Sequence, residues 1–309
     1  MGRPQRPARV ERARRRARER GARPSARRLT QGSRLSRPGA DTRERGTWRE
    51  TAGIPSRTQS LPYGIFSPRG GDPRGGVVVG EQALDLAGLA RSGGLPEVED
   101  ADEVFSQPSL NAFMARGPET WRVCHRRLHE LVSAARLPQE ALFPLGEIES
   151  LLPFEVADYV DFYSSLEHAS NAGRIFRPDA DPLPPNWRHL PVGYHGRAGT
   201  VVVSGTPIVR PCGQFWRHGA AAPEYLPSER VDIELELGAV IGTPSEHGTP
   251  VPVAEALDHV FGLMLLNDWS ARDVQGWETV PLGPFLGKSF ATSVSAWITP
   301  LEDVLDKRV

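Results

Sequence analysis

The stretch of sequence that decides the fold is Val260–Asp273, VFGLMLLNDWSARD, in which seven apolar residues end abruptly at Asn267 and Asp268. A short apolar run of this kind predicts a buried strand. Asp268 is then at or just past the end of that strand, where a carboxylate is costly to desolvate unless it is paired or bound to metal. Asp268 is therefore the first candidate for a functional residue.

A second strand, rich in acidic residues, is predicted at Val231–Gly238, VDIELELG. Its alternation places two sets of residues on opposite faces, Ile233, Leu235 and Leu237 on one and Asp232, Glu234 and Glu236 on the other. Carboxylates that share a face repel one another. Either water screens them on a solvated face, which this strand taken alone favours, or they converge on a hard cation that prefers oxygen ligands.

A third segment, DFYSSLEH, places Asp161, Tyr163 and His168 within eight residues. With the acidic residues above, it completes a carboxylate cage suited to Ca²⁺ or Mg²⁺, formed by Asp161, Glu234, Glu236 and Asp268. His168 is the candidate general base, because histidine titrates near neutral pH. His195 in VGYHGR is a rival, and either one can also be an ordinary surface or core histidine.

Lys288 stands out because lysine is so rare in this chain, which contains 35 Arg and only two Lys. It lies in the apolar, glycine-bounded stretch PLGPFLGKSF. A compact ammonium at this position indicates a role that a planar guanidinium cannot fill, although chance placement is the alternative.

The charge of the chain is strongly asymmetric. The first 50 residues contain 17 Arg and five acidic residues, a net charge of +12, whereas the whole chain carries −1. Residues 1–58 have almost no Ile, Val or Phe, so we predict a disordered Arg-rich extension. It is either an arm for nucleic acid or membrane surfaces or an extension without a role. No aromatic residue occurs before Trp48, so nucleic-acid binding by this tail is not expected.

Composition excludes several classes of protein. The longest apolar run has seven residues, far short of the ~20 that cross a bilayer, and the N-terminus has no apolar core of a secretory signal. The two cysteines, Cys124 and Cys212, argue against a disulfide scaffold or a zinc site and favour a reducing, cytoplasmic setting. No phosphate-binding glycine motif is present.

Long motifs in the second half of the chain resemble the fumarylacetoacetase family. They are DFYSSLEHASNAGRIFR (161–177), PPNWRHLPVGYHGRAGTVVVSGTPI (184–208), DIELELG (232–238) and NDWSARDVQGWETVPLGPFLGKSF (267–290). The likeness begins near Leu61 and is weaker before Phe154. It implies a mainly β fold, with an SH3-like N-terminal barrel over 59–152 and an incomplete mixed β-roll over 153–309, assembled as a homodimer. The apolar pattern itself predicts a helix at Glu119–Ala135.

The resemblance also implies an activity, the hydrolysis of a carbon–carbon bond in 4-fumarylacetoacetate to fumarate and acetoacetate, the last step of tyrosine and phenylalanine catabolism. The implied metal ligands, for Ca²⁺ or Mg²⁺, are Asp161, Glu234, Glu236, Asp268, Lys288 and Thr292. The implied catalytic residues are His168, which activates water, and Arg272, Gln275 and Lys288, which stabilise the oxyanion and the departing carbanion. The implied substrate-binding residues are Tyr163, Arg177, Tyr194 and Gln275.

Two departures from the family pattern bear on these expectations. Thr279 stands where the pattern has a tyrosine that contacts substrate. Family members also continue for a substantial stretch beyond the position of Val309, so we expect this chain to be a C-terminally shortened fragment with little activity. The alternatives are an acylpyruvate or other 1,3-dicarbonyl hydrolase of the same fold, and an inactive fragment.

Overall fold

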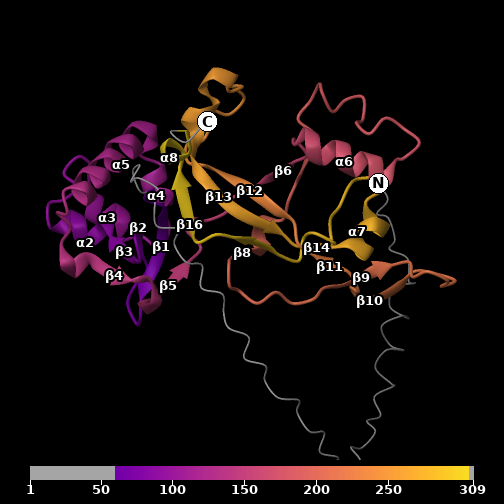
Figure 1. The fold of residues 1–309 in the computed structure, drawn as a ribbon, viewed down its shortest axis with the longest axis horizontal. Helices are drawn as coiled ribbons and strands as arrows, with labels where there is room; N and C mark the ends of the chain where they lie inside the picture. Colours follow the sequence, from indigo (N-terminus) through magenta and orange to yellow (C-terminus); the bar gives the residue numbers. More distant parts are fainter. Residues whose placement is uncertain (1–59, 306–309) are drawn as a thin grey trace, which may run out of the picture. The chain divides into compact units, whose positions relative to one another are not determined.

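The computed structural model of the chain describes residues 60–305, so the predicted N-terminal extension lies outside the described range. A ten-stranded mixed sheet forms the centre of this part (Figure 1). Its strands are β1 (Tyr63–Pro68), β2 (Arg74–Val79), β3 (Gln82–Asp85), β4 (Leu142–Pro144), β5 (Ile148–Leu151), β8 (Val201–Val203), β12 (Leu235–Ile241), β13 (Val260–Asp268), β15 (Thr292–Val294) and β16 (Trp297–Pro300). The fold is mainly β, as predicted.

The order of this sheet joins the two halves of the described chain. Its main path runs β4-β3-β2-β1-β16-β13-β15-β8, while β5 pairs with β1 and β12 pairs with β13. All pairs are antiparallel except β15 with β8. The pairing of β1 with β16 makes one sheet of what we call the N-terminal region (60–153) and the C-terminal region (154–305). The SH3-like barrel implied for the first of these stays a prediction.

Helices cover the strands of the N-terminal region and close its core. They are α2 (Leu86–Arg91), α3 (Ala101–Phe105), α4 (Asn111–Met114) and α5 (Gly117–Ser133), with 3-10 turns η1 (Gln139–Ala141) and η2 (Leu145–Glu147). The helix predicted over 119–135 is confirmed as α5. Trp121, Cys124, Leu128 and Leu131 are buried at the three- and four-residue spacing of one helix face, and they join the main hydrophobic core.

The C-terminal region adds smaller elements. These are β6 (Val160–Phe162), α6 (Leu166–Phe176), β7 (Gly193–His195), η3 (Ala198–Thr200), β9 (Cys212–Phe215), β10 (Glu224–Pro227), β11 (Val231–Asp232), η4 (Val253–His259), β14 (Ser270–Ala271), α7 (Arg272–Glu278) and α8 (Leu301–Leu305). Three two-stranded sheets form from β9 with β10, β11 with β14, and β6 with β7. Within residues 60–305, no helix combines the length and apolar character of a membrane span.

The two strands predicted from the sequence are present with one interruption. The apolar run forms β13, which ends at Asp268 as predicted. The acidic strand is divided between β11 and β12. At the break, Asp232 Oδ1 accepts the N–H of Ile233 at 2.9 Å, and Asn267 Oδ1 accepts the N–H of Glu234 at 3.0 Å. Side chains thus replace ladder bonds where the strand bends toward the end of β13.

The alternation along the acidic strand is confirmed, but the exposed face is the apolar one. Ile233, Leu235 and Leu237 are 62%, 77% and 70% exposed, whereas Glu234 and Glu236 are half-buried. The solvated-face interpretation is therefore wrong for these two glutamates. They point toward other polar side chains in the protein.

Candidate functional site

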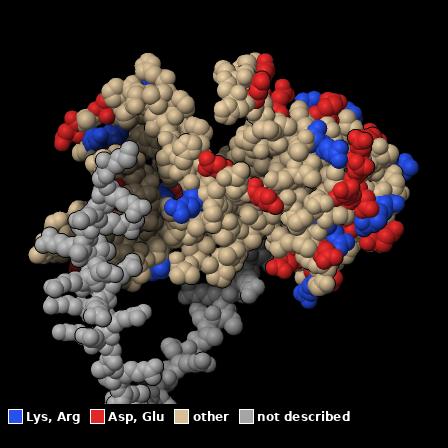
Figure 2. Space-filling view, turned by 180° about the vertical axis from the view of Figure 1, so that it is seen from behind, with Lys and Arg blue, Asp and Glu red and all other residues tan. Residues whose placement is uncertain are grey.

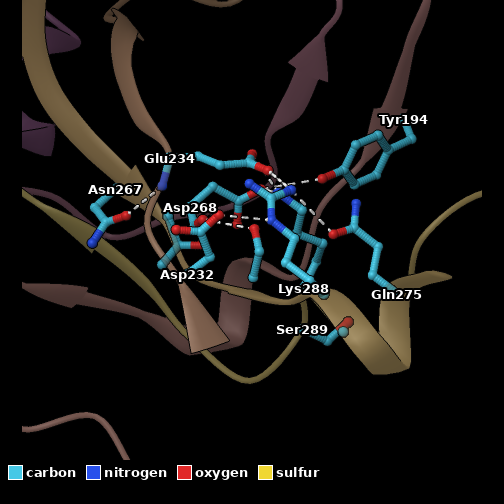
Figure 3. Close-up of polar contacts among 12 residues, drawn as sticks. Tyr194, Asp232, Glu234, Asn267, Asp268, Gln275, Lys288 and Ser289 are labelled. Atoms are coloured by element: carbon cyan, nitrogen blue, oxygen red, sulfur yellow. Dashed lines mark hydrogen bonds and ion pairs between the residues drawn. The ribbon is translucent and has the colours of Figure 1, made fainter. Parts of the chain in front are cut away.

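Asp268 is the centre of the polar cluster at the end of β13. Only 3% of the residue is exposed. Its Oδ2 accepts hydrogen bonds from Lys288 Nζ at 2.7 Å and from the Tyr194 hydroxyl at 3.2 Å (Figure 3). Its buried Oδ1 has no hydrogen-bond partner among the described residues. Burial raises the pKa of Asp268 in spite of Lys288. A further cation at Oδ1 would offset part of this desolvation cost.

Three carboxylates meet at this point, and we call them the acidic trio: Asp161 of β6, Glu236 of β12 and Asp268 of β13. One carboxylate oxygen of each lies within 4.8 Å of the others. Burial, followed by the charges of Asp161 and Asp268, raises the pKa of Glu236 to about 8. Like charges held this close repel, and a divalent cation that prefers oxygen ligands would relieve the repulsion.

Glu234, the fourth predicted metal ligand, is held differently. Lys288 Nζ donates to its Oε2 and Arg272 Nη1 donates to its Oε1. Burial alone would raise the pKa of Glu234, but these two cations outweigh it and the pKa lies below the usual range. The structure therefore brings three of the four predicted carboxylates together and pairs the fourth with two cations beside them.

Lys288 is itself buried, with 6% of the residue exposed, and the loop that carries it is anchored on α7. Glu278 Oε1 accepts the backbone N–H groups of Phe285 and Gly287 at 2.8 and 2.7 Å. A Cβ at Gly287 would lie 2.8 Å from the backbone nitrogen of Gln275, so only glycine allows this close approach. The glycine and the glutamate together fix the position of the ammonium group.

Arg272 and Gln275 add donors from the first turn of α7. Arg272 Nε donates to Asp232 Oδ2 at 3.1 Å, and its Nη1 donates to Gln275 Oε1 at 3.4 Å. Helix α7 starts four residues after Asp268, so the same β13–β14 corner positions the side chains of Asp268, Arg272 and Gln275. Ammonium, guanidinium and amide groups are thus linked through Glu234 and Asp268, and Figure 3 shows Lys288 and Gln275 near these two carboxylates.

Thr292 and Tyr159 also belong to this polar cluster. Thr292, the first residue of β15, pairs with Asp268 across the ladder and is 1% exposed. Its hydroxyl lies 3.2 Å from that of Tyr159. Burial, and less strongly the charges of Asp268 and Asp161, raises the pKa of Tyr159. Sequence reasoning missed Tyr159, although it stands two residues before Asp161, on the same face of an extended chain.

Comparison with known proteins identifies the family. Residues 59–153 match the family profile described as "Fumarylacetoacetase N-terminal", and residues 158–308 match "Fumarylacetoacetate (FAA) hydrolase C-terminal". The chain belongs to the fumarylacetoacetate hydrolase family. The fold class and the family resemblance read from the motifs are therefore confirmed.

Curated relatives with the name fumarylacetoacetase are close in sequence. The protein of Rattus norvegicus is 45% identical over 256 residues, covering 80% of this chain and 61% of that protein. The protein of Homo sapiens is 46% identical over 255 residues, with the same coverage. The chain thus spans about 61% of the length of these relatives.

Among solved structures, "Fumarylacetoacetate hydrolase (EaFAH) from psychrophilic Exiguobacterium antarcticum" matches with a TM-score of 0.45 and 21% identity. The match covers 78% of this chain and 67% of that chain. Individual residues of the two chains are therefore not compared.

The predicted base of this family member, His168, lies in the first turn of α6. The Ser165 hydroxyl caps that helix by accepting the backbone N–H of His168 at 3.2 Å. The imidazole is exposed and packs edge-on against the Tyr163 ring, with centroids 5.3 Å apart. Among residues 60–305 it makes no hydrogen bond to the acidic trio, so its role as base stays a prediction. The rival His195 is exposed and lies 3.6 Å from Asp158.

The predicted substrate-binding residues differ in how closely they approach the trio. Tyr194 pairs with Asp161 across β6 and β7, and its hydroxyl reaches Asp268. Burial, with the charges of Asp268 and Asp161, raises its pKa strongly. Arg177 instead donates to the carbonyl of Pro182 at 2.7 Å on the surface. Tyr194 is therefore placed at the site, whereas a contact of Arg177 with substrate stays a prediction.

Thr279, the residue that departs from the family pattern, ends α7. Its hydroxyl donates to the carbonyl of Gln275 at 2.6 Å and the residue is exposed. This bond occupies the hydroxyl within the helix end, so Thr279 presents a methyl group where the family pattern has a phenol.

Proposed function

We propose that this chain carries the catalytic centre of a fumarylacetoacetase, which hydrolyses a carbon–carbon bond of 4-fumarylacetoacetate to give fumarate and acetoacetate. The observation that carries the proposal is the buried ammonium of Lys288, which lies 2.7 Å from Asp268 beside the acidic trio and Arg272. This reaction needs both a cation site and fixed donors. Membership of the fumarylacetoacetate hydrolase family supports the same conclusion.

The acidic trio fits a divalent ion of the Ca²⁺ or Mg²⁺ type. All three groups offer oxygen, the Oδ1 of Asp268 has no protein partner among the described residues, and burial together with the nearby carboxylates raises the pKa of Glu236. Asp161, Glu236 and Asp268 would hold the ion, with Glu234 and Thr292 beside them. When bound, such an ion polarises a carbonyl oxygen of a diketone and orients it.

The chain's own donors supply the stabilisation of negative charge. Cleavage of a carbon–carbon bond leaves an enolate, which is a poor leaving group unless its oxygen is stabilised. Arg272 and Gln275 are held by α7, and Lys288 is held by the loop that Glu278 anchors on that helix. Donors preorganised in this way usually make the largest single contribution to catalysis. His168 would take a proton from the attacking water, and Tyr163, Tyr194 and Arg177 would bind substrate.

A related 1,3-dicarbonyl substrate, such as an acylpyruvate, is the second candidate. The observation that favours it is Thr279, whose short side chain leaves the end of α7 without the phenol of the family pattern. A substrate with a different acyl end would meet different contacts at this position. Assembly as a homodimer, implied by the family resemblance, is part of the proposal.

The experiment is a single-turnover assay with the protein in excess over 4-fumarylacetoacetate, with Mg²⁺ or Ca²⁺ present, and with fumarate quantified by mass spectrometry. Excess protein is needed because His168 has no orienting partner among the described residues, so we expect slow turnover. Acylpyruvate is assayed in parallel. Fumarate formation that disappears in Lys288→Met supports the proposal. Faster cleavage of acylpyruvate favours the second candidate, and no cleavage of either substrate overturns both.

A further inference from the structure

A second cluster of metal-ligating side chains lies between α5 and α8 and shares no residue with the acidic trio. His125 and His129 are four residues apart on α5, and Asp303 belongs to α8. His125 Nε2 lies 2.9 Å from Asp303 Oδ1 and 3.1 Å from His129 Nε2, and His129 Nε2 lies 3.6 Å from Asp303 Oδ1. Two imidazole nitrogens and one carboxylate oxygen therefore converge on one point.

The size of this triangle matches a tetrahedral metal ion. Bonds of about 2.0–2.1 Å to nitrogen and oxygen place the ligand atoms of a tetrahedral zinc ion roughly 3.3 Å apart. The three observed separations, 2.9, 3.1 and 3.6 Å, lie around that value. Two histidines four residues apart on one helix are also the spacing that presents both rings to a single ion.

Hydrogen bonding alone satisfies this arrangement poorly. Each imidazole nitrogen has one site in the ring plane, which holds either a proton or a lone pair. A proton on His125 Nε2 points either to Asp303 Oδ1 or to His129 Nε2, but its single in-plane site cannot serve both atoms. If His125 Nε2 carries a lone pair instead, that lone pair faces Asp303 Oδ1. One cation at the centre of the triangle satisfies all three atoms at once.

The surroundings of the cluster are those of a built site. Side chains of His125 and Asp303 are each 9% exposed, and that of His129 is 19% exposed. Asp303 Oδ2 accepts the Ser60 hydroxyl at 2.7 Å and the N–H of Leu61 at 3.1 Å, which aims Oδ1 at the histidines. The ring of His125 lines a cavity of about 130 Å³, large enough for water that would accept a proton from its buried Nδ1.

We propose that His125, His129 and Asp303 bind one divalent transition-metal ion of the zinc type. Among residues 60–305 the site has three protein ligands, and a tetrahedral ion would take a fourth ligand as well. The ion joins α5, α8 and the residues that lead into β1, three segments far apart in sequence. The two-cysteine composition pointed away from zinc, but this site uses no cysteine.

The two metal sites differ in chemistry and can be told apart. The acidic trio offers oxygen only and suits Ca²⁺ or Mg²⁺, whereas imidazole nitrogen selects Zn²⁺, Co²⁺, Ni²⁺ or Cu²⁺. Excess Mg²⁺ therefore occupies the trio without displacing zinc from the histidine site.

The test uses the full chain without an affinity tag, stripped of metal with a chelator and kept in excess Mg²⁺. Zn²⁺ is titrated in competition with a chromophoric chelator, and Co²⁺ is used to record the visible absorption of a four-coordinate ion. We expect one Zn²⁺ per chain. His129→Gln should weaken binding by more than the roughly 10- to 100-fold loss that follows removal of a ligand's hydrogen-bond partner. His247→Gln, in an exposed loop, and Glu236→Gln, in the trio, should bind Zn²⁺ as the unaltered protein does.

Asp303→Asn is the second variant, because its amide oxygen still accepts bonds from Ser60 and Leu61 while the negative charge is lost. Circular dichroism checks that each variant is folded. Loss of the cobalt spectrum in both His129→Gln and Asp303→Asn confirms the site. The proposal is overturned if the unaltered protein binds no Zn²⁺ at 1:1 stoichiometry. It is also overturned if His129→Gln binds it equally well, and the cluster is then only a hydrogen-bonded joint.

Discussion

The N-terminal and C-terminal regions use their apolar residues in opposite ways. Of the twelve largest fully buried side chains, eleven lie between Leu61 and Leu128, and only Ile298 lies in the C-terminal region. All 21 exposed large hydrophobic residues of the described chain lie between Val160 and Leu286. One region is thus organised around an apolar core, whereas the other turns carboxylates inward and leaves apolar side chains outside.

The surface shows the same contrast. In Figure 2, acidic and basic side chains gather over the N-terminal region, and the face over the C-terminal region carries few of them. Exposed apolar patches of large extent are typical of surfaces that another segment or molecule covers. We infer from the contrast that the N-terminal region supplies most of the stability of this chain, while the C-terminal region supplies the chemistry.

The largest effect should come from Lys288, and it should be on chemistry. Lys288→Met removes a preorganised donor, which typically costs about 10²- to 10³-fold in turnover. Lys288→Arg should recover little, because the planar fork differs in shape from the ammonium. Single-turnover formation of fumarate measures both variants. Near-normal turnover in Lys288→Met would mean that Arg272 and Gln275 stabilise the oxyanion alone.

A matched pair of leucines tests the difference in stability directly. Leu84 of β3 is fully buried and Leu237 of β12 is 70% exposed. Leu84→Ala should lower the free energy of unfolding by about 2–5 kcal/mol, because it removes buried methyl groups and leaves a cavity. Leu237→Ala should change it by less than about 0.5 kcal/mol. Urea unfolding followed by circular dichroism compares them, and equal losses would contradict the contrast between the regions.

Ion binding at the acidic trio should stabilise the C-terminal region. An ion at 100 times its dissociation constant adds about 2.7 kcal/mol to the free energy of unfolding. Glu236→Gln should abolish this gain, yet without divalent ions it should be at least as stable as the unaltered protein, because glutamine does not carry the cost that raises the pKa of Glu236 on folding. Melting temperatures with and without Ca²⁺ or Mg²⁺ reveal the reversal. The same ion-induced gain in Glu236→Gln would rule out Glu236 as a ligand.

Glu278 should have a smaller effect, through the loop that carries Lys288. Glu278→Ala leaves the backbone N–H groups of Phe285 and Gly287 without their acceptor, which costs about 1–3 kcal/mol where they are buried. Glu278→Gln keeps an acceptor oxygen and is the control. The urea midpoint of Glu278→Ala should therefore lie below that of Glu278→Gln. Identical midpoints would show that water replaces the carboxylate.

The smallest effect should be a pH dependence at Asp273. Burial raises the pKa of Asp273, but bonds from the Ser228 hydroxyl and the N–H groups of Glu229 and Val274 outweigh it, so the pKa lies below the usual range. Because its folded pKa is depressed, Asp273 adds stability at pH values above its unfolded pKa of about 4. That stability is lost as the pH falls through the folded pKa. The stability difference between the unaltered protein and Asp273→Asn should therefore shrink between pH 7 and pH 3. A constant difference would contradict this.

Local patterns predicted the parts of the site that depend on local rules. The apolar run that stops at Asp268 predicted both the strand and its buried carboxylate, because burial of an acid demands a partner. The rarity of lysine singled out Lys288 before any contact was known. The alternation of the acidic strand predicted two faces, but not which face would be covered, because that depends on elements distant in sequence.

Other features had no local signal strong enough to find them. Nothing near Glu234 shows that two cations, Arg272 and Lys288, bind it from 38 and 54 residues away. From the sequence alone, Glu278 looks like an ordinary surface carboxylate, because its role as an acceptor depends on the loop that folds back onto α7. His125 and His129 read as part of an amphipathic helix, since Asp303 lies 178 residues further along the chain from His125. Each of these contacts joins residues that meet only through the tertiary structure.

The pairing of β1 with β16 sets an order of events during synthesis of the chain. Tyr63 pairs with Ile298 and Gly64 pairs with Trp297, so one edge of β1 is completed by a strand that is made more than 200 residues later, as 298 − 63 = 235. At about 5–20 residues per second, a ribosome needs roughly 10 to 50 s between these strands. For that time the apolar edge at Tyr63 and Gly64 stands open to pairing with other chains. This edge of β1 is therefore protected from such pairing only after translation has passed Pro300.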